Sequence, residues 1–379
     1  MLKSTLTLYL LSFLSLTLTA CGDGGLSVQT GEAREAKETK KFPETRNVYK
    51  WPFAQNSIWN TPIGSNAEYV PAGIQPALKR TMRADQDVII LNPNAPLTPV
   101  YKNNVGWRKG DPGGRCRREG EKLVDLPIPF DFVANHGSSV PNMAAAILKP
   151  DGRTLYQTQP FHRCQAGEYA TSKHVFPEVD IYGDGILGAH GGSGLSSIGG
   201  TIRLGELVPN GVIRHALKVN IYGGKNISYT EDDTPGYRWP AIRADKRAKR
   251  DYHGVVPELE MGALLALKPD FDLNSLQTEP GRILARAFID YGGYVADHTG
   301  WDIYAITTQL SPEGRVLDEF KNHWGYTFNQ NGVDNPWAQD IRTIFTNLHV
   351  VDNNTPETPG GGGTPRQPLA PPFAEAETE

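Results

Sequence analysis

The chain has 379 residues, a formal net charge of −4 and 39% hydrophobic residues. The hydrophobic content is sufficient for a buried core, and the slightly acidic balance argues against a general binder of polyanions such as nucleic acid. The 40 glycines and 29 prolines favour many turns and short strands over long helices.

The N-terminus has the composition of an export signal. Lys3 precedes a short apolar run from Thr5 to Leu18, and small residues follow the run. This order is typical of a secretory signal peptide, and the serine and threonine content of the run argues against an N-terminal membrane helix. An ordinary signal peptide and an N-terminal membrane helix are the alternatives to a lipoprotein signal peptide.

The four residues Leu18-Thr19-Ala20-Cys21 resemble the lipobox of bacterial lipoproteins. The resemblance covers only the first 21 residues of the chain. It implies that the signal peptide, residues 1–20, is removed and that Cys21 becomes the lipidated first residue of the mature protein. It also implies a lipid anchor in the bacterial cell envelope, and Gly22 in place of an aspartate favours the outer membrane.

Composition divides the rest of the chain into three parts. Residues 21–45 are polar and charged without an apolar face, so we expect a flexible tether after the lipidated cysteine. Residues 353–379 are rich in proline and glycine, which predicts a disordered tail. Residues 46–352 remain and are predicted to form a single β-rich globular domain.

Two cysteines remain once Cys21 is assigned to lipid. Exported proteins enter an oxidising compartment in which disulfides persist, so we predict a bond between Cys116 and Cys164. Metal ligation is the alternative, but neither cysteine lies in a CxxC motif and no HxxxH motif accompanies them.

Two helices can be recognised in the second half of the chain, near 279–292 and near 336–350. Each begins at a capping residue followed by proline, and each places apolar residues on one face. Short apolar segments separated by glycine and proline turns predict strands at 87–91, 144–148, 201–204, 216–222, 264–267 and 301–307. Together these elements predict a mainly β fold, an antiparallel β-sandwich or jelly roll with a few peripheral helices.

Residues 179–207 form a glycine-dense segment with several polar side chains. Such a segment inside a folded domain favours a binding cleft lined by backbone amides, and tight turns between strands are the alternative. Ser193 lacks the final glycine of a GxSxG nucleophile motif, and the GxxxxGK[ST] pattern of a phosphate-binding loop is missing. The candidate site residues here are Asp180, Asp184, His190, Arg203 and Glu206.

Three further segments follow the glycine-dense one. His215 shares a predicted strand face with apolar residues, so a buried structural histidine is the alternative to a catalytic one. Tyr237, Arg238 and Trp239 could form a platform for a sugar ring or a structural corner. The basic run 243–250 is interpreted as a solvated surface, or else as a contact for an acidic polysaccharide.

The last candidate segment lies between the first predicted helix and a strand. It contains Asp297, His298, Trp301 and Asp302, which could supply an acid, a base and a stacking surface. The alternative is turn chemistry in which the aspartates cap backbone groups.

These features predict an envelope-anchored, carbohydrate-active enzyme that cleaves a polysaccharide or oligosaccharide. Hydrolysis is slightly favoured over elimination because the chain is acidic, and a non-catalytic lipoprotein that binds glycan or protein at the surface is the alternative. No cofactor is expected, except that a calcium site around Asp180 and Asp184 is a minor alternative. The predicted catalytic residues are Asp180, Asp184, His190, Glu206, His215, Asp297 and Asp302, and the predicted substrate-binding residues are Arg203, Tyr237, Arg238, Trp239 and Trp301.

Overall fold

The computed structural model describes residues 42–78, 82–107, 114–135, 142–330, 332 and 334–374. The predicted signal peptide, Cys21 and most of the predicted tether lie outside these residues. Phe42 begins the compact unit that carries the structure below. Within the described ranges, no helix has the length and apolar character needed to cross a lipid bilayer.

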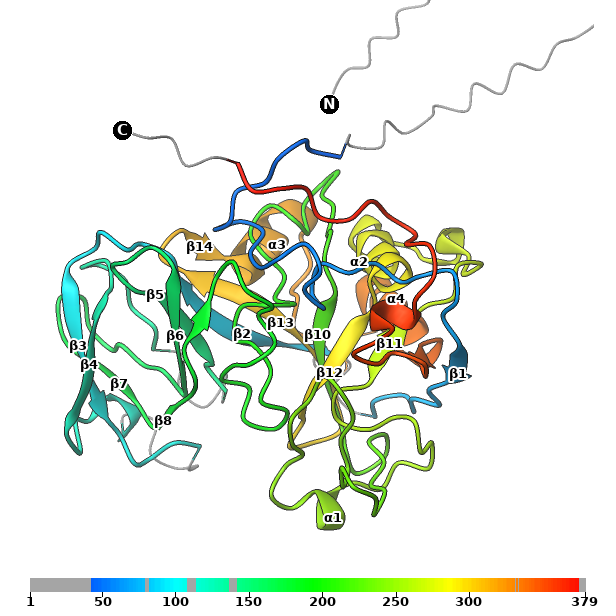
Figure 1. Cartoon of the computed structure of the whole chain (residues 1–379), viewed down its shortest axis with the longest axis horizontal. Coiled ribbons are helices and arrows are strands. Elements are labelled where there is room, and N and C mark those ends of the chain that lie inside the picture. Colours follow the sequence, from blue (N-terminus) through cyan, green and yellow to red (C-terminus); the bar gives the residue numbers. More distant parts are fainter. Residues whose placement is uncertain are drawn as a thin grey trace, which may run out of the picture. The chain divides into compact units, whose positions relative to one another are not determined.

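A large mixed β-sheet runs through this unit (Figure 1). Its twelve strands among the described residues are β1 (Tyr69–Pro71), β2 (Met82–Ile90), β5 (Ala145–Leu148), β6 (Thr154–Gln159), β8 (His174–Val175), β9 (Val179–Asp180), β10 (Leu217–Ile221), β11 (Leu264–Ala266), β12 (Gly293–His298), β13 (Tyr304–Ser311), β14 (Gly314–Arg315) and β15 (His349–Val351). The main order is β1-β15-β11-β12-β10-β13-β2-β5-β6-β8, while β14 pairs with β13 and β9 with β6.

The prediction of a mainly β fold with a few helices is confirmed, but the large sheet is not antiparallel throughout. β10 pairs in parallel with β12, and β2 pairs in parallel with both β13 and β5. β2 and β5 are buried along nearly their whole lengths, as is usual when both faces of a parallel sheet are covered. The expected antiparallel sandwich or jelly roll is therefore corrected to a mixed sheet.

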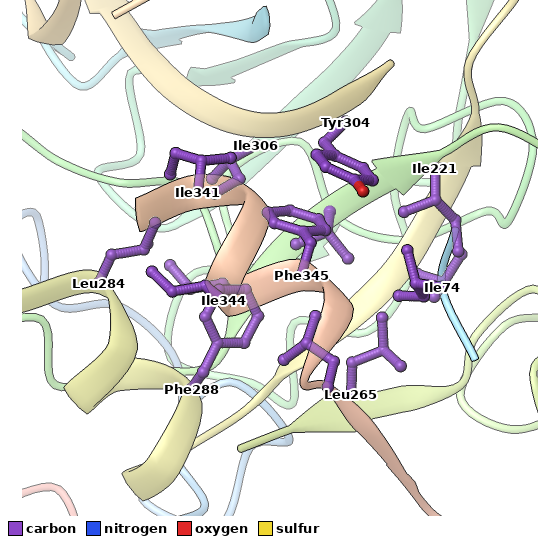
Figure 2. Close-up of a cluster of buried hydrophobic side chains, with 14 of the residues drawn as sticks. Ile74, Ile221, Leu265, Leu284, Phe288, Tyr304, Ile306, Ile341, Ile344 and Phe345 are labelled. Atoms are coloured by element: carbon purple, nitrogen blue, oxygen red, sulfur yellow. The ribbon is translucent and has the colours of Figure 1, made fainter. Parts of the chain in front are cut away.

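Three helices pack on one face of the sheet: α2 (Glu279–Asp290), α3 (Val316–Trp324) and α4 (Pro336–Thr346). Figure 2 shows Phe345 of α4 between Tyr304 of β13 and Phe288 of α2. The opposite face is covered in part by an N-terminal segment that contains the buried Trp59. Polar residues on that second face are therefore buried as well, and the candidate site lies among them.

The two predicted helices are confirmed as α2 and α4. The side chains of Thr278 and Asn335 accept hydrogen bonds from the first turns of α2 and α4, and each helix has a proline at its start. The sequence pattern did not predict α3, which ends at Gly325 with a left-handed φ of 71°. The predicted strand 201–204 forms only an isolated bridge, between Ile202 and Thr308.

A second sheet of three strands among the described residues contains β3 (Leu97–Lys102), β4 (Lys122–Pro127) and β7 (Ala170–Ser172). The predicted disulfide is confirmed in this region, where Cys116 is bonded to Cys164 with 5.8 Å between the Cα atoms. The bond closes a loop with a sequence separation of 48 residues. It links the short 3-10 helix Gly114–Cys116 to the segment that precedes β7.

Replacing both Cys116 and Cys164 by serine is expected to lower the free energy of unfolding by about 4 kcal/mol, because a cross-link of this loop length restricts the unfolded chain. Urea unfolding of the purified protein measures the change. Reducing agent should lower the stability of the wild type by a similar amount and leave the double variant unchanged. A double variant as stable as the oxidised wild type would contradict a stabilising role for the bond.

The prediction of a disordered tail does not hold for residues 353–374. The Arg46 side chain donates to the Pro371 carbonyl at 2.7 Å, and its guanidinium lies 3.8 Å from the centre of the Phe373 ring. The backbone N–H of Gly64 donates to the carbonyl of Gly360 at 3.0 Å. Glycines 360–363 all have positive φ, so the composition that suggested flexibility instead permits a tight, specific backbone path.

Candidate functional site

A cavity of about 640 Å³ opens beside the carboxyl end of β12. Its walls come from β12, the glycine-dense segment, the segment around Asp245 and residues near β8. The residues that line it include Trp107, Asn142, His174, Gly192, Arg243, Asp245, Lys246, Arg247, Asp297 and His298. The cavity therefore brings together parts of the chain that lie far apart in the sequence.

The face of the sheet opposite the helices carries the polar floor of this region. Asp85 and Asp87 alternate along β2, and Lys218 and Asn220 alternate along β10, so each pair shares one face of its strand. The register of β12 shifts by one residue, so that Asn220 pairs with Asp297 after Val219 pairs with Val295. A bulge of this kind re-aims the following side chain, which brings Asp297 to the polar face.

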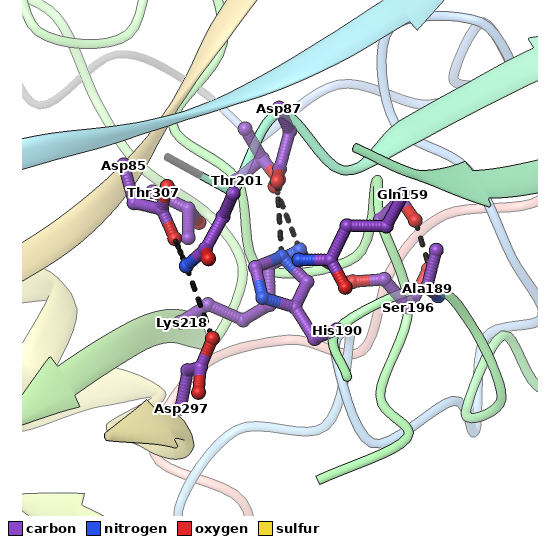
Figure 3. A network of polar contacts seen from close by, with 12 residues as sticks. Asp85, Asp87, Gln159, Ala189, His190, Ser196, Thr201, Lys218, Asp297 and Thr307 are labelled. Atoms are coloured by element: carbon purple, nitrogen blue, oxygen red, sulfur yellow. Dashed lines mark hydrogen bonds and ion pairs between the residues drawn. The ribbon is translucent and has the colours of Figure 1, made fainter. Parts of the chain in front are cut away.

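Asp87 is the centre of a fully buried polar network (Figure 3). His190 Nε2 donates to Asp87 Oδ1 at 2.9 Å, while Lys218 Nζ and Thr201 Oγ1 donate to Oδ2 at 2.8 and 2.5 Å. Burial raises the pKa of Asp87, but its interactions with Lys218 and His190 lower the pKa by more than burial raises it. The net shift is therefore downward. Asp87 is therefore an ionised anchor that fixes the His190 ring.

Asp85 and Asp297 form a second, adjacent group of buried carboxyls. The Asn142 Nδ2 atom donates to both, at 2.8 Å to Asp85 and 3.0 Å to Asp297, and Asn220 Nδ2 donates to Asp85 at 2.8 Å. Burial raises the pKa of Asp297 well above its usual range, and the nearby carboxylates of Asp245 and Asp85 raise it further. Burial also raises the pKa of Asp85.

The residues that could hold a metal ion are at this floor. One ligand atom from each of Asp85, His190 and Asp297 lies within 4.8 Å of the other two, and all three residues are buried. His190 Nδ1 and Asn220 Oδ1 are buried and have no hydrogen-bond partner in the described part of the chain. The floor thus has unused ligand atoms as well as two neighbouring carboxyls.

Asp245 faces the same space from the cavity wall. Tyr252 donates its hydroxyl to Asp245 Oδ2 at 2.7 Å, and burial raises the pKa of Tyr252 far above its usual range. A Cβ atom built on Gly192 would lie 2.7 Å from Asp297 Oδ1 and 3.4 Å from Asp245 Oδ2. Because residue 192 is glycine, the space beside it stays open, and both carboxyl groups border this space.

His298 has a defined tautomer when it is neutral. The backbone N–H of Gly223 donates to His298 Nδ1 at 3.0 Å, so the proton of the neutral ring resides on Nε2. Burial lowers the pKa of His298, and the neighbouring carboxylates of Asp245 and Asp251 act in the opposite direction. The ring is therefore a hydrogen-bond donor toward the cavity rather than a proton acceptor through Nδ1.

The outer cavity combines an aromatic ring with cationic side chains. Trp107 is 39% exposed and stacks on His174 at a centroid distance of 5.5 Å. Arg243 donates to the Gly191 carbonyl at 3.0 Å, and Lys246 and Arg247 are exposed at the rim. An exposed indole beside hydrogen-bond donors is suited to stacking on a sugar ring.

The structure brings His190, Asp297 and His298 to this site and places the remaining predicted catalytic and substrate-binding residues elsewhere. Asp180 pairs with Arg153 on the surface, and Asp184 is exposed, with Oδ1 accepting from the Ile186 backbone at 3.1 Å. Asp302 pairs with Lys225 at 2.5 Å. These partners occupy Asp180 and Asp302 outside the cavity, and Trp301 does not line it.

The remaining predicted residues have structural partners. Arg203 Nε donates to Gln309 Oε1 at 2.8 Å, and Arg238 pairs with Asp352 at 3.0 Å. Trp239 packs at the edge of the hydrophobic cluster on the second face, and Tyr237 forms a backbone bridge with Met261. The structural-corner interpretation therefore describes residues 237–239 better than the sugar platform.

His215, which is buried, pairs with the partly buried Glu206 away from the cavity, with 3.1 Å between His215 Nε2 and Glu206 Oε2. Burial lowers the pKa of His215, but the Glu206 carboxylate and the Ala216 carbonyl together raise it by more, so the net shift is upward from 6.5. The pair should therefore stabilise the fold fully below about pH 6.5, and this contribution should be lost as the pH rises through the folded-state pKa.

Urea unfolding of the wild type and His215→Gln across this pH range measures the contribution. The difference in unfolding free energy between the two proteins should shrink as the pH rises. A difference that is constant across the range, or that grows with pH, would contradict the assignment.

Several site residues were missed by the sequence analysis. Asp85 and Asp87 interrupt an apolar segment two positions apart, and this alternation on one strand face was the available signal. Lys218 lies between the apolar residues Leu217 and Val219, so the sequence also showed that it points to the opposite strand face. Asp245 lies within the basic run 243–250, which was interpreted as a solvated surface. Tyr252 follows that run and belongs to no distinctive motif.

Comparison with known proteins gave no relative, since no protein-family model, no curated protein and no solved structure matches the chain.

Proposed function

We propose that the protein is an enzyme that hydrolyses a polysaccharide or oligosaccharide in this cavity, and that a lipid on Cys21 anchors it in the bacterial envelope. The observation that carries the proposal is the convergence of Asp245 and Asp297 on the space beside Gly192, in a cavity that also contains the exposed Trp107 ring. Hydrolysis of a glycosidic bond generally uses two carboxyl groups that flank the reacting atoms.

Asp245 is the residue best placed to move protons. Tyr252 fixes one of its oxygens, and Oδ1 has no hydrogen-bond partner among the described residues. Asp245 takes a proton from the attacking water and returns a proton to the departing glycosidic oxygen. The water oxygen forms the new bond to the sugar carbon as the glycosidic bond breaks, so atoms and protons balance.

Asp297 and His298 act on the two other participants. Asp297 lies deeper than Asp245 and orients the water at the floor of the cavity. The Nε2–H of neutral His298 is available to hydrogen-bond the departing oxygen. The aromatic face of Trp107 holds the sugar ring, and Arg243, Lys246 and Arg247 suit a glycan with acidic substituents.

Elimination is less well supported than hydrolysis. A polysaccharide lyase needs a base that removes a proton from carbon, usually a histidine or tyrosine. Burial raises the pKa of Tyr252, whose hydroxyl already donates to Asp245, and His298 Nδ1 already accepts a hydrogen bond. Neither side chain is therefore prepared to act as that base.

Incubation with a panel of neutral and acidic polysaccharides tests the proposal through the release of new reducing ends. Cleavage of at least one glycan is expected from the wild type and from Asp302→Asn, a control whose substituted carboxylate lies outside the cavity. Binding of a glycan without cleavage would overturn the proposal in favour of a non-catalytic surface binder, which could use the same outer cavity.

A further inference from the structure

We infer that Asp85, His190 and Asp297 bind a divalent transition-metal ion, such as Mn²⁺ or Zn²⁺, at the floor of the cavity. The three residues come from β2, the glycine-dense segment and β12. Their ligand atoms all lie within 4.8 Å of one another. Ligands on opposite sides of one ion are separated by about twice the bond length of 2.0–2.4 Å, so this spacing suits a shared ion.

His190 provides an independent reason to expect a ligand. Its side chain is fully buried, and Nδ1 has no hydrogen-bond partner among the residues that the structure describes. Because Nε2 donates to Asp87, the lone pair of the neutral ring resides on Nδ1. Figure 3 shows the ring between Asp87 on one side and Asp297 on the other. A buried nitrogen lone pair without a donor is costly unless a cation or a proton donor occupies the site.

The contact between Asp87 and His190 is the arrangement that metal-binding histidines commonly have. The ring nitrogen that does not bind the ion usually donates to a carboxylate, which fixes the tautomer and the ring orientation. Asp87 is itself fixed by Lys218 and Thr201. This chain of buried contacts holds Nδ1 in one position and leaves it available as a ligand.

Within the described ranges, no cationic side chain donates a hydrogen bond to Asp85 or Asp297. Among the described residues, Lys218 pairs with Asp87, and the direct hydrogen-bond donors to the Asp85 side chain are the neutral amides of Asn142 and Asn220. Two adjacent buried carboxylates are unfavourable without a cation. An ion would neutralise both. Asn220 Oδ1, which has no hydrogen-bond partner within the described ranges, is a further candidate ligand.

The ligand set restricts the type of ion. An imidazole nitrogen with two carboxylates suits Mn²⁺ or Zn²⁺ better than calcium, which prefers oxygen ligands only, and there is no thiolate for a softer metal. In the proposed hydrolysis, the ion would lower the pKa of the attacking water, and Asp245 would receive its proton. This role in activating water rests on the proposed function, whereas the inference that the site binds a metal does not.

Titration of the chelator-treated, full-length protein with MnCl₂ or ZnCl₂ in a calorimeter tests the inference. One ion per chain is expected to bind the wild type. His190→Gln and Asp297→Asn should each weaken binding by about a hundredfold or more, because outer partners of metal ligands alone contribute about 10–100-fold. Asp180→Asn, which removes a surface carboxylate outside the cavity, should bind as the wild type does.

The outcomes separate the inference from the proposed function. Circular dichroism and thermal unfolding establish that each variant is folded, and Asp297→Asn provides a second test if His190→Gln does not fold. A folded wild type that binds neither ion, or a His190→Gln variant that binds with unchanged affinity, would overturn the metal site. Glycan cleavage by a protein that binds no metal would support the hydrolase proposal and overturn the metal site. Metal binding without cleavage of any glycan would support the metal site and overturn the hydrolase proposal.

Discussion

Asp245→Asn is expected to lower kcat on a cleaved glycan by about 10²- to 10⁴-fold, the usual contribution of a group that transfers protons. The amide keeps the size of the carboxylate and can still accept the hydrogen bond from Tyr252. It cannot take up a proton from water, so the chemical step should slow while KM changes little. Steady-state kinetics on the best substrate of the panel measures both parameters.

Two controls make the Asp245 result specific. Asp302→Asn removes a carboxylate outside the cavity and should retain wild-type kinetics. Asp245→Asn itself should bind Mn²⁺ or Zn²⁺ as the wild type does, because Asp245 is not among the three inferred ligands. Undiminished kcat in a folded Asp245→Asn protein would show that another group moves the proton.

Lys218→Met is expected to lower the free energy of unfolding by about 3–5 kcal/mol, the cost of removing one partner from a buried ion pair. Lys218 is fully buried, and its Nζ lies 2.8 Å from Asp87 Oδ2. Methionine fills a similar volume but leaves the Asp87 carboxylate without its cation. Urea unfolding in the presence of a chelator measures the loss without a contribution from bound metal.

Arg153→Met is the matched control for the Lys218 experiment. Arg153 pairs with Asp180 on the surface, where its side chain is 62% exposed, so losing this pair should cost less than about 1 kcal/mol. If the two variants lost the same small amount of stability, the Asp87 network would not be the buried anchor described above.

Local sequence signals predicted the elements that depend on neighbouring residues. Thr278 and Asn335 marked the starts of α2 and α4 because capping and proline placement act within one turn. The Cys116–Cys164 bond followed from the number of cysteines once Cys21 was set aside. The tail was misjudged because glycine composition suggests flexibility, whereas residues 360–363 use positive φ in specific contacts.

The pairing of strands could not be read from local signals. β2 lies between β13 and β5, although β13 follows it by more than two hundred positions in the chain. A sequence pattern shows which residues share a strand face, but not which distant strand becomes its neighbour. The parallel pairs were therefore missed, and a series of short strands was interpreted as an antiparallel sandwich.

The site was predicted only in part for the same reason. His190 and Asp297 were candidates because they lie in unusual local segments, but Asp85, Asp87 and Lys218 resembled isolated polar residues in apolar strands. Asp297 also reaches the polar face through the shift in register of β12, which simple alternation does not predict. Only the assembled sheet places these charged groups in contact.

The most direct test of the proposed hydrolysis is digestion of the glycan panel in water labelled with oxygen-18, followed by mass spectrometry of the products. Hydrolysis predicts that each new reducing end contains one labelled oxygen in the wild type and that Asp245→Asn forms little labelled product. Unsaturated products without the label, or no cleavage of any glycan by the folded wild-type protein, would contradict the account.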